Sequence, residues 1–168
     1  MINVVLFEPE IPANTGNIMR TCVATNTVLH LIKPLGFSLE DKYIKRCGVN
    51  YIDKCKYFVY ENIDEFFEKN KGEYYFFTRY GHKPHTSFDY SNDKNIYLFF
   101  GKESTGIPPS ILKPYLDRCI RIPMTDNVRA LNLSNTVCVA VYEVLRQKNY
   151  EGLLFDEPFK GNDFIENS

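Results

Sequence analysis

Residues 98–109 read Leu-Phe-Phe-Gly-Lys-Glu-Ser-Thr-Gly-Ile-Pro-Pro, and their order predicts a strand, an open loop and the start of a helix. The apolar run Ile96–Phe100 has the length of a buried strand, and it ends abruptly at Gly101. Gly106 follows in the loop, just ahead of a Pro pair that can open a helix. Because glycine has no Cβ, we expect both glycines to allow left-handed backbone conformations and the close approach of a ligand.

Glu103 favours a ligand loop over a plain tight turn. It lies between the two glycines, in a loop that follows the carboxyl end of a predicted strand. Such loops are the usual ligand sites of open α/β sheets. A turn whose glycines serve only the chain reversal stays open as the alternative.

The composition predicts one domain. The chain has 168 residues, of which 44% are hydrophobic and 15% aromatic, enough to bury one sizeable core. We expect this domain to span residues 1–154, followed by a flexible acidic tail over residues 155–168. No leader segment and no apolar stretch of membrane-spanning length is found, so we expect a soluble, cytoplasmic protein.

The cysteines and the charges exclude some classes of protein. Five scattered cysteines without a Cys-x-x-Cys pair predict reduced thiols rather than a disulfide framework or a zinc site. The net charge of −1 does not by itself indicate a nucleic-acid partner. Acidic residues gather from Glu151 onward and leave the rest of the chain mildly basic, so a local cluster of cations could still bind phosphate.

Apolar runs alternate with helical patterns, which predicts an α/β fold with a mainly parallel sheet flanked by helices. The predicted strands are residues 2–7, 28–32, 57–60, 74–78, 96–100 and 119–124. Asn14 or Thr15 is expected to cap the first helix, and Asn62 with Glu65 forms a capping box for another. A helix over residues 39–47 would expose three cations that could meet phosphate, Lys42, Lys45 and Arg46.

Four polar loops follow predicted strands, at residues 9–20, 78–87, 101–106 and 124–134. We expect them to converge, because the carboxyl ends of parallel strands meet at one edge of a sheet. Asn17 and Arg20, spaced i and i+3, would lie side by side on the first helix, although an ordinary solvated face is an open alternative. Neither a Gly-x-Gly-x-x-Gly nor a Gly-Lys-Ser/Thr motif is present, which argues against a standard dinucleotide or NTP enzyme.

The loop at residues 79–87 combines cations, an aromatic ring and histidines, as single-stranded RNA sites do. Arg79, His82 and Lys83 are its candidate RNA contacts. His82 and His85 lack an accompanying carboxylate or cysteine, so we expect no metal site.

The predicted helix over residues 135–148 is apolar nearly all round, so it must be covered on more than one side. In a chain of this size we expect a second copy to bury Val137, Val141 and Val144.

Three segments together resemble a known family. The first reads Pro9-Glu10-Ile11-Pro12-x-Asn14-Thr15-Gly16-Asn17-x-x-Arg20, and the second reads Phe100-Gly101-x-Glu103-x-x-Gly106-Ile107-Pro108. The third reads Ile120-Arg121-Ile122-Pro123-Met124, continued by Arg129-Ala130-Leu131-Asn132-Leu133-Ser134-Asn135. They match, in order, the three motifs of the SPOUT RNA methyltransferases. From residue 1 to about residue 154 the chain most resembles the tRNA (cytidine/uridine wobble-position) 2′-O-methyltransferases.

The resemblance implies the SPOUT, or α/β-knot, fold, with a C-terminal trefoil knot. It also implies a homodimer that binds S-adenosyl-L-methionine and the tRNA anticodon loop. The implied reaction methylates the ribose 2′-hydroxyl of the wobble nucleotide, a cytidine or modified uridine, with leucine isoacceptors as the first expectation. No metal is implied.

The resemblance also assigns residues to roles. Asn17, Arg20 and Glu103 match positions tied to catalysis, and Arg20 is expected to hold a phosphate and orient the hydroxyl, because a guanidinium stays protonated in proteins. Arg129 would contact RNA. The cofactor would be bound by Thr78, Gly101, Ile122, Ala130, Leu131 and Asn135. Many relatives carry Ser where this chain has Ala130, and a main-chain contact to the cofactor would survive that change.

Two alternatives remain at the level of the sequence. The chain could methylate another tRNA or rRNA ribose within the same superfamily, or it could be a noncatalytic module that binds S-adenosylmethionine or RNA. Calorimetry with S-adenosylmethionine together with a methyl-transfer assay separates the enzyme from the module.

Overall fold

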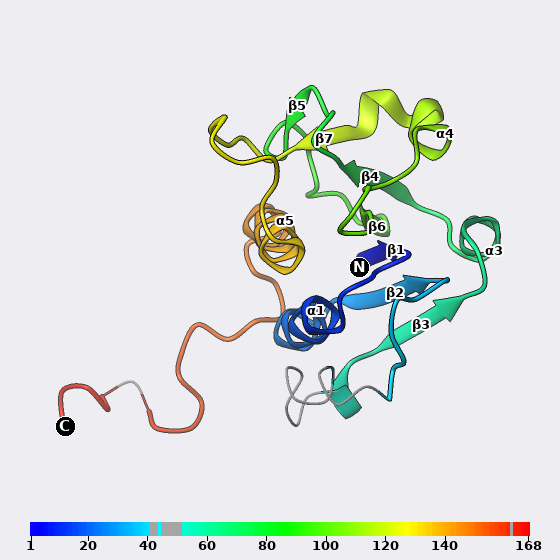
Figure 1. Cartoon of the computed structure of the whole chain (residues 1–168). Helices are drawn as coiled ribbons and strands as arrows, with labels where there is room; N and C mark the ends of the chain where they lie inside the picture. Colours follow the sequence, from blue (N-terminus) through cyan, green and yellow to red (C-terminus); the bar gives the residue numbers. More distant parts are fainter. Residues whose placement is uncertain (41–43, 45–51, 162) are drawn as a thin grey trace.

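The computed structural model describes residues 1–40, 44, 52–161 and 163–168, and its strands form one sheet (Figure 1). The seven described strands follow the order β3-β2-β1-β6-β4-β7-β5, and all neighbours pair in parallel. The predicted parallel sheet flanked by helices is therefore confirmed. The strands are β1 (Ile2–Phe7), β2 (Val28–Ile32), β3 (Tyr57–Tyr60), β4 (Glu73–Phe77), β5 (Lys83–Pro84), β6 (Ile96–Phe100) and β7 (Cys119–Arg121).

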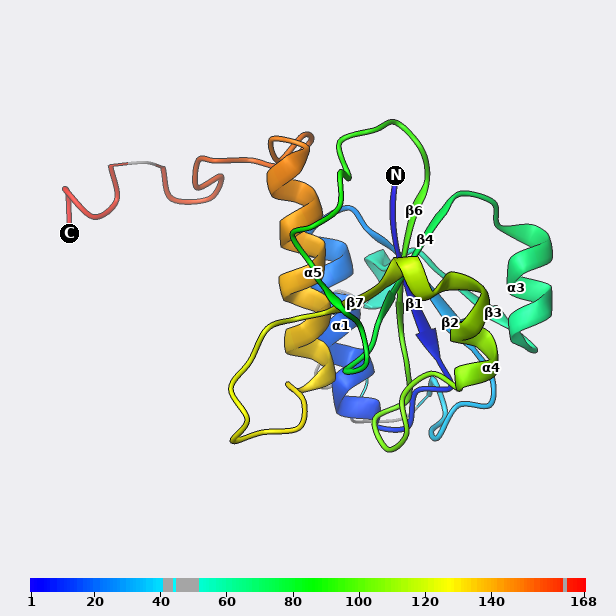
Figure 2. The same ribbon diagram turned by 90° about the horizontal axis from the view of Figure 1, so that it is seen from above.

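Helices cover both faces of the sheet (Figures 1 and 2). α1 (Pro12–Ala24) and α5 (Leu133–Gln147) pack side by side on one face, over a core that includes Leu98. α3 (Ile63–Lys69) and α4 (Pro109–Leu112) lie on the other face, over a core rich in aromatic rings. All residues of β1, β2 and β6 are buried, as expected for central parallel strands covered on both sides.

Most of the predicted strands have the expected bounds, whereas β7 and β5 differ from the prediction for a physical reason. β1, β2, β3 and β6 have the predicted bounds, and β4 begins and ends one residue early. β7 stops at Arg121, short of the predicted residue 124, because Pro123 has no N–H to donate to the sheet. β5 was not predicted; it is a two-residue strand inside the 79–87 loop, held by pairing with β7.

The predicted cap of the first helix is wrong. α1 begins at Pro12, so Asn14 and Thr15 lie within the helix, and its N-cap residue, Ile11, makes no side-chain cap hydrogen bond. By contrast, Asn62 caps α3 as predicted, since its side chain accepts a hydrogen bond from Glu65 N at 2.9 Å. The Glu65 carboxylate reaches back to Glu61 N, at 2.7 Å.

The predicted cover for the last helix also needs correction. Val137, Val141 and Val144 are buried in the core of the single chain, between α5 and the sheet, so they need no second copy. The large apolar side chains that α5 leaves exposed are Val139 (40% exposed) and Tyr142 (43%).

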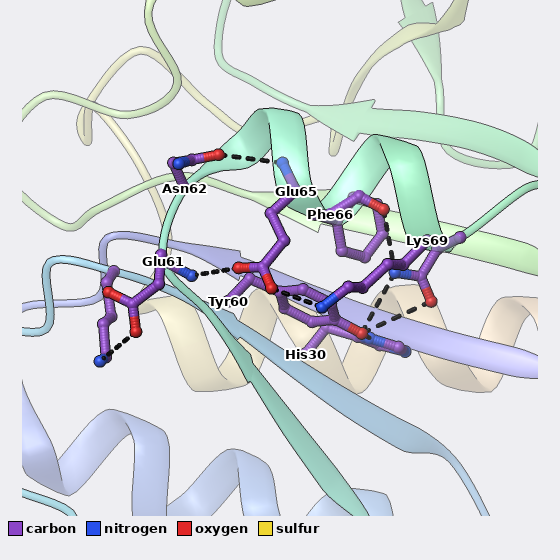
Figure 3. A network of polar contacts seen from close by, with 9 residues as sticks. His30, Tyr60, Glu61, Asn62, Glu65, Phe66 and Lys69 are labelled. Carbon is purple, nitrogen blue, oxygen red and sulfur yellow. Dashed lines mark hydrogen bonds and ion pairs between the residues drawn. The ribbon is translucent and has the colours of Figure 1, made fainter.

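A group of neutral polar residues joins β1, β2 and β3 to the end of α3, and Figure 3 shows His30 and Tyr60 of this group. His30 is buried, with Nδ1 2.8 Å from the Tyr60 hydroxyl and Nε2 3.1 Å from Asn3 Oδ1. Asn70 Nδ2 donates to the same hydroxyl at 3.1 Å. Burial lowers the pKa of His30 to about 4, so the imidazole is neutral at pH 7. We call Asn3, His30, Tyr60 and Asn70 the histidine network.

The described residues of 155–168 form no helix or strand, and they extend away from the body of the fold (Figure 1). The helix predicted over residues 39–47 lies largely outside the described residues. None of the described helices is both long enough and apolar enough to span a membrane.

Candidate active site

A cavity of about 690 Å³ lies where the four polar loops meet, at the carboxyl ends of β4, β6 and β7. The loop after β1 contributes Ile11 and Asn14, and the loop after β6 contributes residues 101–106. The other two loops contribute residues 78–80 and 129–132. The predicted convergence of the four loops is therefore confirmed. Their meeting point includes the carboxyl end of β6, which lies between β1 and β4 in the middle of the sheet.

Glu103 fastens the loop after β6 to the start of α1. Its carboxylate accepts hydrogen bonds from Glu10 N (2.8 Å), Ile11 N (3.2 Å) and Asn14 Nδ2 (2.9 Å). The N–H groups at the start of a helix need partners, and the positive end of the helix dipole favours a carboxylate there. A residue from a distant loop thus takes the place of the side-chain cap that Ile11 cannot provide.

Two further contacts join the same loops. The Glu10 carboxylate accepts hydrogen bonds from Ser104 Oγ and Ser104 N, both at 2.8 Å, and these bonds hold the pKa of Glu10 below its usual value. Lys102 Nζ lies 2.6 Å from Glu8 Oε2, and this hydrogen bond raises the pKa of Lys102. Glu8 itself has a left-handed backbone, with φ of 47°, at the sharp turn that leaves β1.

Asn14 carries the connection to the third motif. Its Oδ1 accepts a hydrogen bond from Asn132 Nδ2 at 3.0 Å. Asn132 in turn caps α5, because its Oδ1 accepts from Ser134 N at 2.9 Å. We call this set the loop clamp; it consists of Glu8, Glu10, Asn14, Lys102, Glu103, Ser104 and Asn132.

The two glycines of the 101–106 loop have different roles. Gly106 has φ of 75°, and a Cβ there would meet no atom within 4 Å, so its left-handed conformation was predicted correctly. Gly101 has no such angle, and the expectation of a left-handed conformation there is wrong. A Cβ on Gly101 would lie 2.2 Å from Gly106 C and 2.3 Å from Ile107 N. Gly101 is therefore required by the close packing of the loop on itself.

Most predicted cofactor residues lie around this cavity. Its lining includes Thr78, Gly101, Ile122, Ala130 and Leu131. Asn135 is not among the lining residues; it is exposed in the first turn of α5, where its N–H lies 3.4 Å from Asn132 Oδ1.

Of the three predicted catalytic residues, one lines the cavity and two do not. Glu103 lines the cavity, with its carboxylate engaged in the loop clamp. Asn17 and Arg20 are exposed on α1, beyond the turn that reaches the cavity, and neither lines it.

Of the four predicted RNA contacts, two line the cavity and two lie outside it. Arg79 and Arg129 line the cavity, whereas His82 and Lys83 are exposed outside it. A second hollow, of about 310 Å³, shares Arg79, Tyr80, Arg121 and Arg129 with the first. Among the described residues, no group of three His, Cys, Asp or Glu side chains is placed to hold a metal ion.

The sequence alone gave no site role to Asn14, Asn132 or Arg121, and it noted Tyr80 only as the aromatic ring of the 79–87 loop. Asn14, Asn132 and Tyr80 lie in polar loops that follow predicted strands, and Arg121 lies in the third motif; these positions were the available signal. Their partners, however, come from other loops, which a reading of each loop by itself does not reveal.

Comparison with known proteins gives a consistent result. The sequence profile of the SpoU rRNA methylase family matches residues 1–142. A Geobacillus stearothermophilus protein, named as a candidate tRNA (cytidine(34)-2′-O)-methyltransferase, is 54% identical over 90% of this chain and 98% of its own length. The Yersinia pestis tRNA (cytidine(34)-2′-O)-methyltransferase is 42% identical over 94% of this chain and its full length. A solved structure described as giving insight into 2′-OH methylation of C/U34 on tRNA has a TM-score of 0.82 and 36% identity, and the match covers 89% of this chain and 97% of that one.

Proposed function

The chain belongs to the SpoU rRNA methylase family, and we propose that it methylates the ribose 2′-hydroxyl of nucleotide 34 of tRNA, a cytidine or modified uridine. The observation that carries this proposal is the match, over nearly the whole of both chains, to proteins named for that reaction. Leucine isoacceptors are the first substrates to test. The reaction takes place where tRNA is found, in the cytoplasm.

The 690 Å³ cavity suits S-adenosylmethionine as the methyl donor. Its walls combine apolar side chains such as Ile122 and Leu131 with the tightly packed backbone of Gly101, which leaves main-chain groups for polar contacts. Thr78 and Ala130 would contact the donor as well. When bound, S-adenosylmethionine supplies an electrophilic methyl group.

The residues of this chain would contribute mainly position. The ribose 2′-oxygen must lie in line with the methyl group, and correct alignment accounts for a large part of the rate in such reactions. We assign Glu103 to this task indirectly, because its hydrogen bonds fix the 101–106 loop against α1. Asn17 and Arg20 would handle the ribose hydroxyl and a neighbouring phosphate.

We propose that a second copy of the chain brings Asn17 and Arg20 to the site. Both residues are exposed on α1 and lie outside the cavity lining of their own chain. The neighbouring α5 exposes Val139 and Tyr142, which offer apolar area for a contact between two copies. In such a homodimer, Arg20 of one copy would face the donor cavity of the other.

We also propose the trefoil knot of the SPOUT fold for the C-terminal segment. In support, β7 lies between β4 and β5, both earlier in the sequence, and the segment that leads from β7 to α5 lines the cavity. Thr78 N donates to Ile120 O at 2.9 Å, so the two segments that would cross are in contact.

The activity is tested with radiolabelled S-adenosylmethionine and anticodon stem-loops. We expect label in the stem-loop with cytidine at position 34 and none when that nucleotide is 2′-deoxy. Label in the 2′-deoxy RNA would point to another target ribose. Binding of S-adenosylmethionine in calorimetry, without transfer to any RNA, would indicate a noncatalytic module.

The homodimer is tested by complementation between two inactive variants. Arg20→Ala removes the proposed hydroxyl-handling side chain, and Gly101→Ala disrupts the donor cavity. Co-expressed in equal amounts, they should restore about a quarter of the wild-type activity, because half of the dimers are mixed and each keeps one intact site. No recovery would place Arg20 at the cavity of its own chain.

Arg20→Lys tests the role of the guanidinium itself. Lysine keeps the charge but loses the planar fork. We expect at least a tenfold loss in rate, equivalent to about 1.4 kcal/mol. A rate near that of the wild type would reduce Arg20 to a simple phosphate contact.

A further inference from the structure

The second hollow lies directly beside the proposed donor cavity. The two share Arg79, Tyr80, Arg121 and Arg129, so they open into each other. Three of these four residues are arginines, and the acid that lines the hollow is Asp126. A hollow with this excess of positive charge, adjoining a methyl-donor cavity, suits one nucleotide of a polyanion.

Tyr80 provides an aromatic surface at this hollow. Tyr80 is 66% exposed, so a ligand in the hollow can reach most of its ring. The Arg79 guanidinium lies 4.7 Å from the centroid of the ring, and Arg79 Nη2 donates to the Tyr80 hydroxyl at 2.6 Å. Arginine therefore orients the ring and leaves most of its area available for stacking.

The loop that carries Tyr80 is fixed to β7 at several points. Thr78 N donates to Ile120 O at 2.9 Å, and Arg121 Nη1 donates to Arg79 O at 3.0 Å. Gly81 packs so closely on the strand that a Cβ there would lie 2.4 Å from Ile120 C. A ring on a loop held in this way is already in place before RNA binds, so little conformational entropy is lost on binding.

We propose that Tyr80 is the stacking platform for the base of the nucleotide to be methylated, and that Arg121 and Arg129 hold the phosphate beside it. This inference rests on the proposed function and names the part of the site that receives the substrate. Stacking needs only the π-face of a base, so such a platform accepts a cytidine and a modified uridine alike. The Arg121 side chain has a second, positioning role, because it holds the carbonyl of Arg79.

The test uses an anticodon stem-loop that carries the fluorescent cytidine analogue pyrrolocytidine at position 34. Titration with wild-type protein should change the fluorescence as the base stacks on Tyr80. Tyr80→Ala should abolish the change and weaken stem-loop binding about tenfold, whereas Tyr80→Phe, which keeps the ring, should stay within about threefold of wild type. S-adenosylmethionine affinity, measured by calorimetry, should change less than stem-loop affinity in Tyr80→Ala, although Tyr80 also lines the donor cavity.

Tyr57→Ala is the matched control, since Tyr57 is an exposed tyrosine on β3, away from both hollows. The inference is overturned if Tyr80→Ala binds and stacks the probe as the wild type does, or if Tyr57→Ala has an equal effect. It is also overturned if a probe at position 32 depends on Tyr80 while the probe at position 34 does not. The titration requires no methyl transfer, so a wild-type protein that binds the probe but transfers no methyl would contradict the proposed function alone.

Discussion

The loop clamp and the histidine network both join segments that are far apart in the sequence, but they do so in different surroundings. The histidine network lies between the sheet and α3 among aromatic rings, and its members are uncharged. The loop clamp lies at the carboxyl ends of the strands, is partly exposed, and uses the carboxylates of Glu10 and Glu103. The contrast indicates that the same kind of polar contact stabilises the fold in one place and shapes the 690 Å³ cavity in the other.

The largest effect is expected from a change within the loop that the clamp holds. Gly101→Ala places a Cβ 2.2 Å from Gly106 C, a backbone atom that cannot move without displacing the loop. We expect S-adenosylmethionine affinity to fall by about a hundredfold or more, because a displacement of binding groups by about 1 Å can cause a loss of that size. Calorimetry measures the affinity, and circular dichroism verifies the fold.

Gly106→Ala is the control for this change in the same loop. A Cβ there meets no atom within 4 Å, so the cost is limited to the strained φ of 75°, about 1 kcal/mol. Equal losses for the two variants would show that the packing of Gly101 is not what shapes the cavity.

The next effect concerns the histidine network and pH. The pKa of His30 falls from 6.5 to about 4 on folding, so between these values the unfolded chain binds more protons than the folded one. Stability should therefore be complete above about pH 6.5 and decline as the pH falls toward 4. From pH 7 to pH 5 we expect a loss of about 2 kcal/mol from this group, measured by urea unfolding.

His30→Gln is the matched variant, because its amide can hydrogen-bond but does not titrate in this range. It should be less stable than the wild type at pH 7 and should show a flatter pH dependence between 7 and 5. An unchanged slope would show that His30 is not the group responsible.

Glu103→Gln should have a smaller effect, and on activity rather than on stability. Glutamine keeps one acceptor oxygen, but its NH₂ group replaces the other. One of the two backbone N–H groups that now donate to the carboxylate would then face a donor instead of an acceptor. We expect methyl transfer to fall about tenfold, or about 1.4 kcal/mol, while the free energy of unfolding changes by less than about 1 kcal/mol. A loss of stability without a loss of activity would remove the distinction between the two regions.

The smallest effect is expected at the edge of the histidine network. Asn62→Ala deletes the cap of α3, whose side chain accepts from Glu65 N (Figure 3). The stability should fall by about 1 kcal/mol, and the rate of methyl transfer should stay at the wild-type value. A reduced rate in this variant would mean that the two regions are coupled through the sheet.

Local sequence patterns correctly predicted the features of the fold that depend on residues close together in the chain. The apolar runs at residues 2–7, 28–32, 57–60 and 96–100 gave strands with the correct bounds. Three of them are fully buried parallel strands, which are apolar along their length, whereas β3 lies at the edge of the sheet and exposes three of its four residues. The Asn62 cap was also predictable, since donor and acceptor are three residues apart. β5 was not predictable, because two residues carry no periodic signal and the strand exists only through pairing with β7.

The lining of the cavity was predicted in part. The motifs and the family resemblance that they carry pointed to Thr78, Gly101, Ile122, Ala130 and Leu131, all of which line the cavity. They did not reveal that the Glu103 carboxylate is bound to the start of α1, nor that Asn17 and Arg20 lie outside the cavity of their own chain. Those facts depend on how α1 is oriented over the sheet.

The sequence by itself determined the alternation of strands and helices, the family, and the four loops that carry polar residues. The tertiary structure decided which of these residues meet. Glu103 and Glu10 are 93 positions apart, and Asn132 and Asn14 are 118 apart. They are brought together because β1 lies next to β6 and α1 next to α5. Such an order of strands and helices results from packing over the whole core, which no local pattern of residues contains.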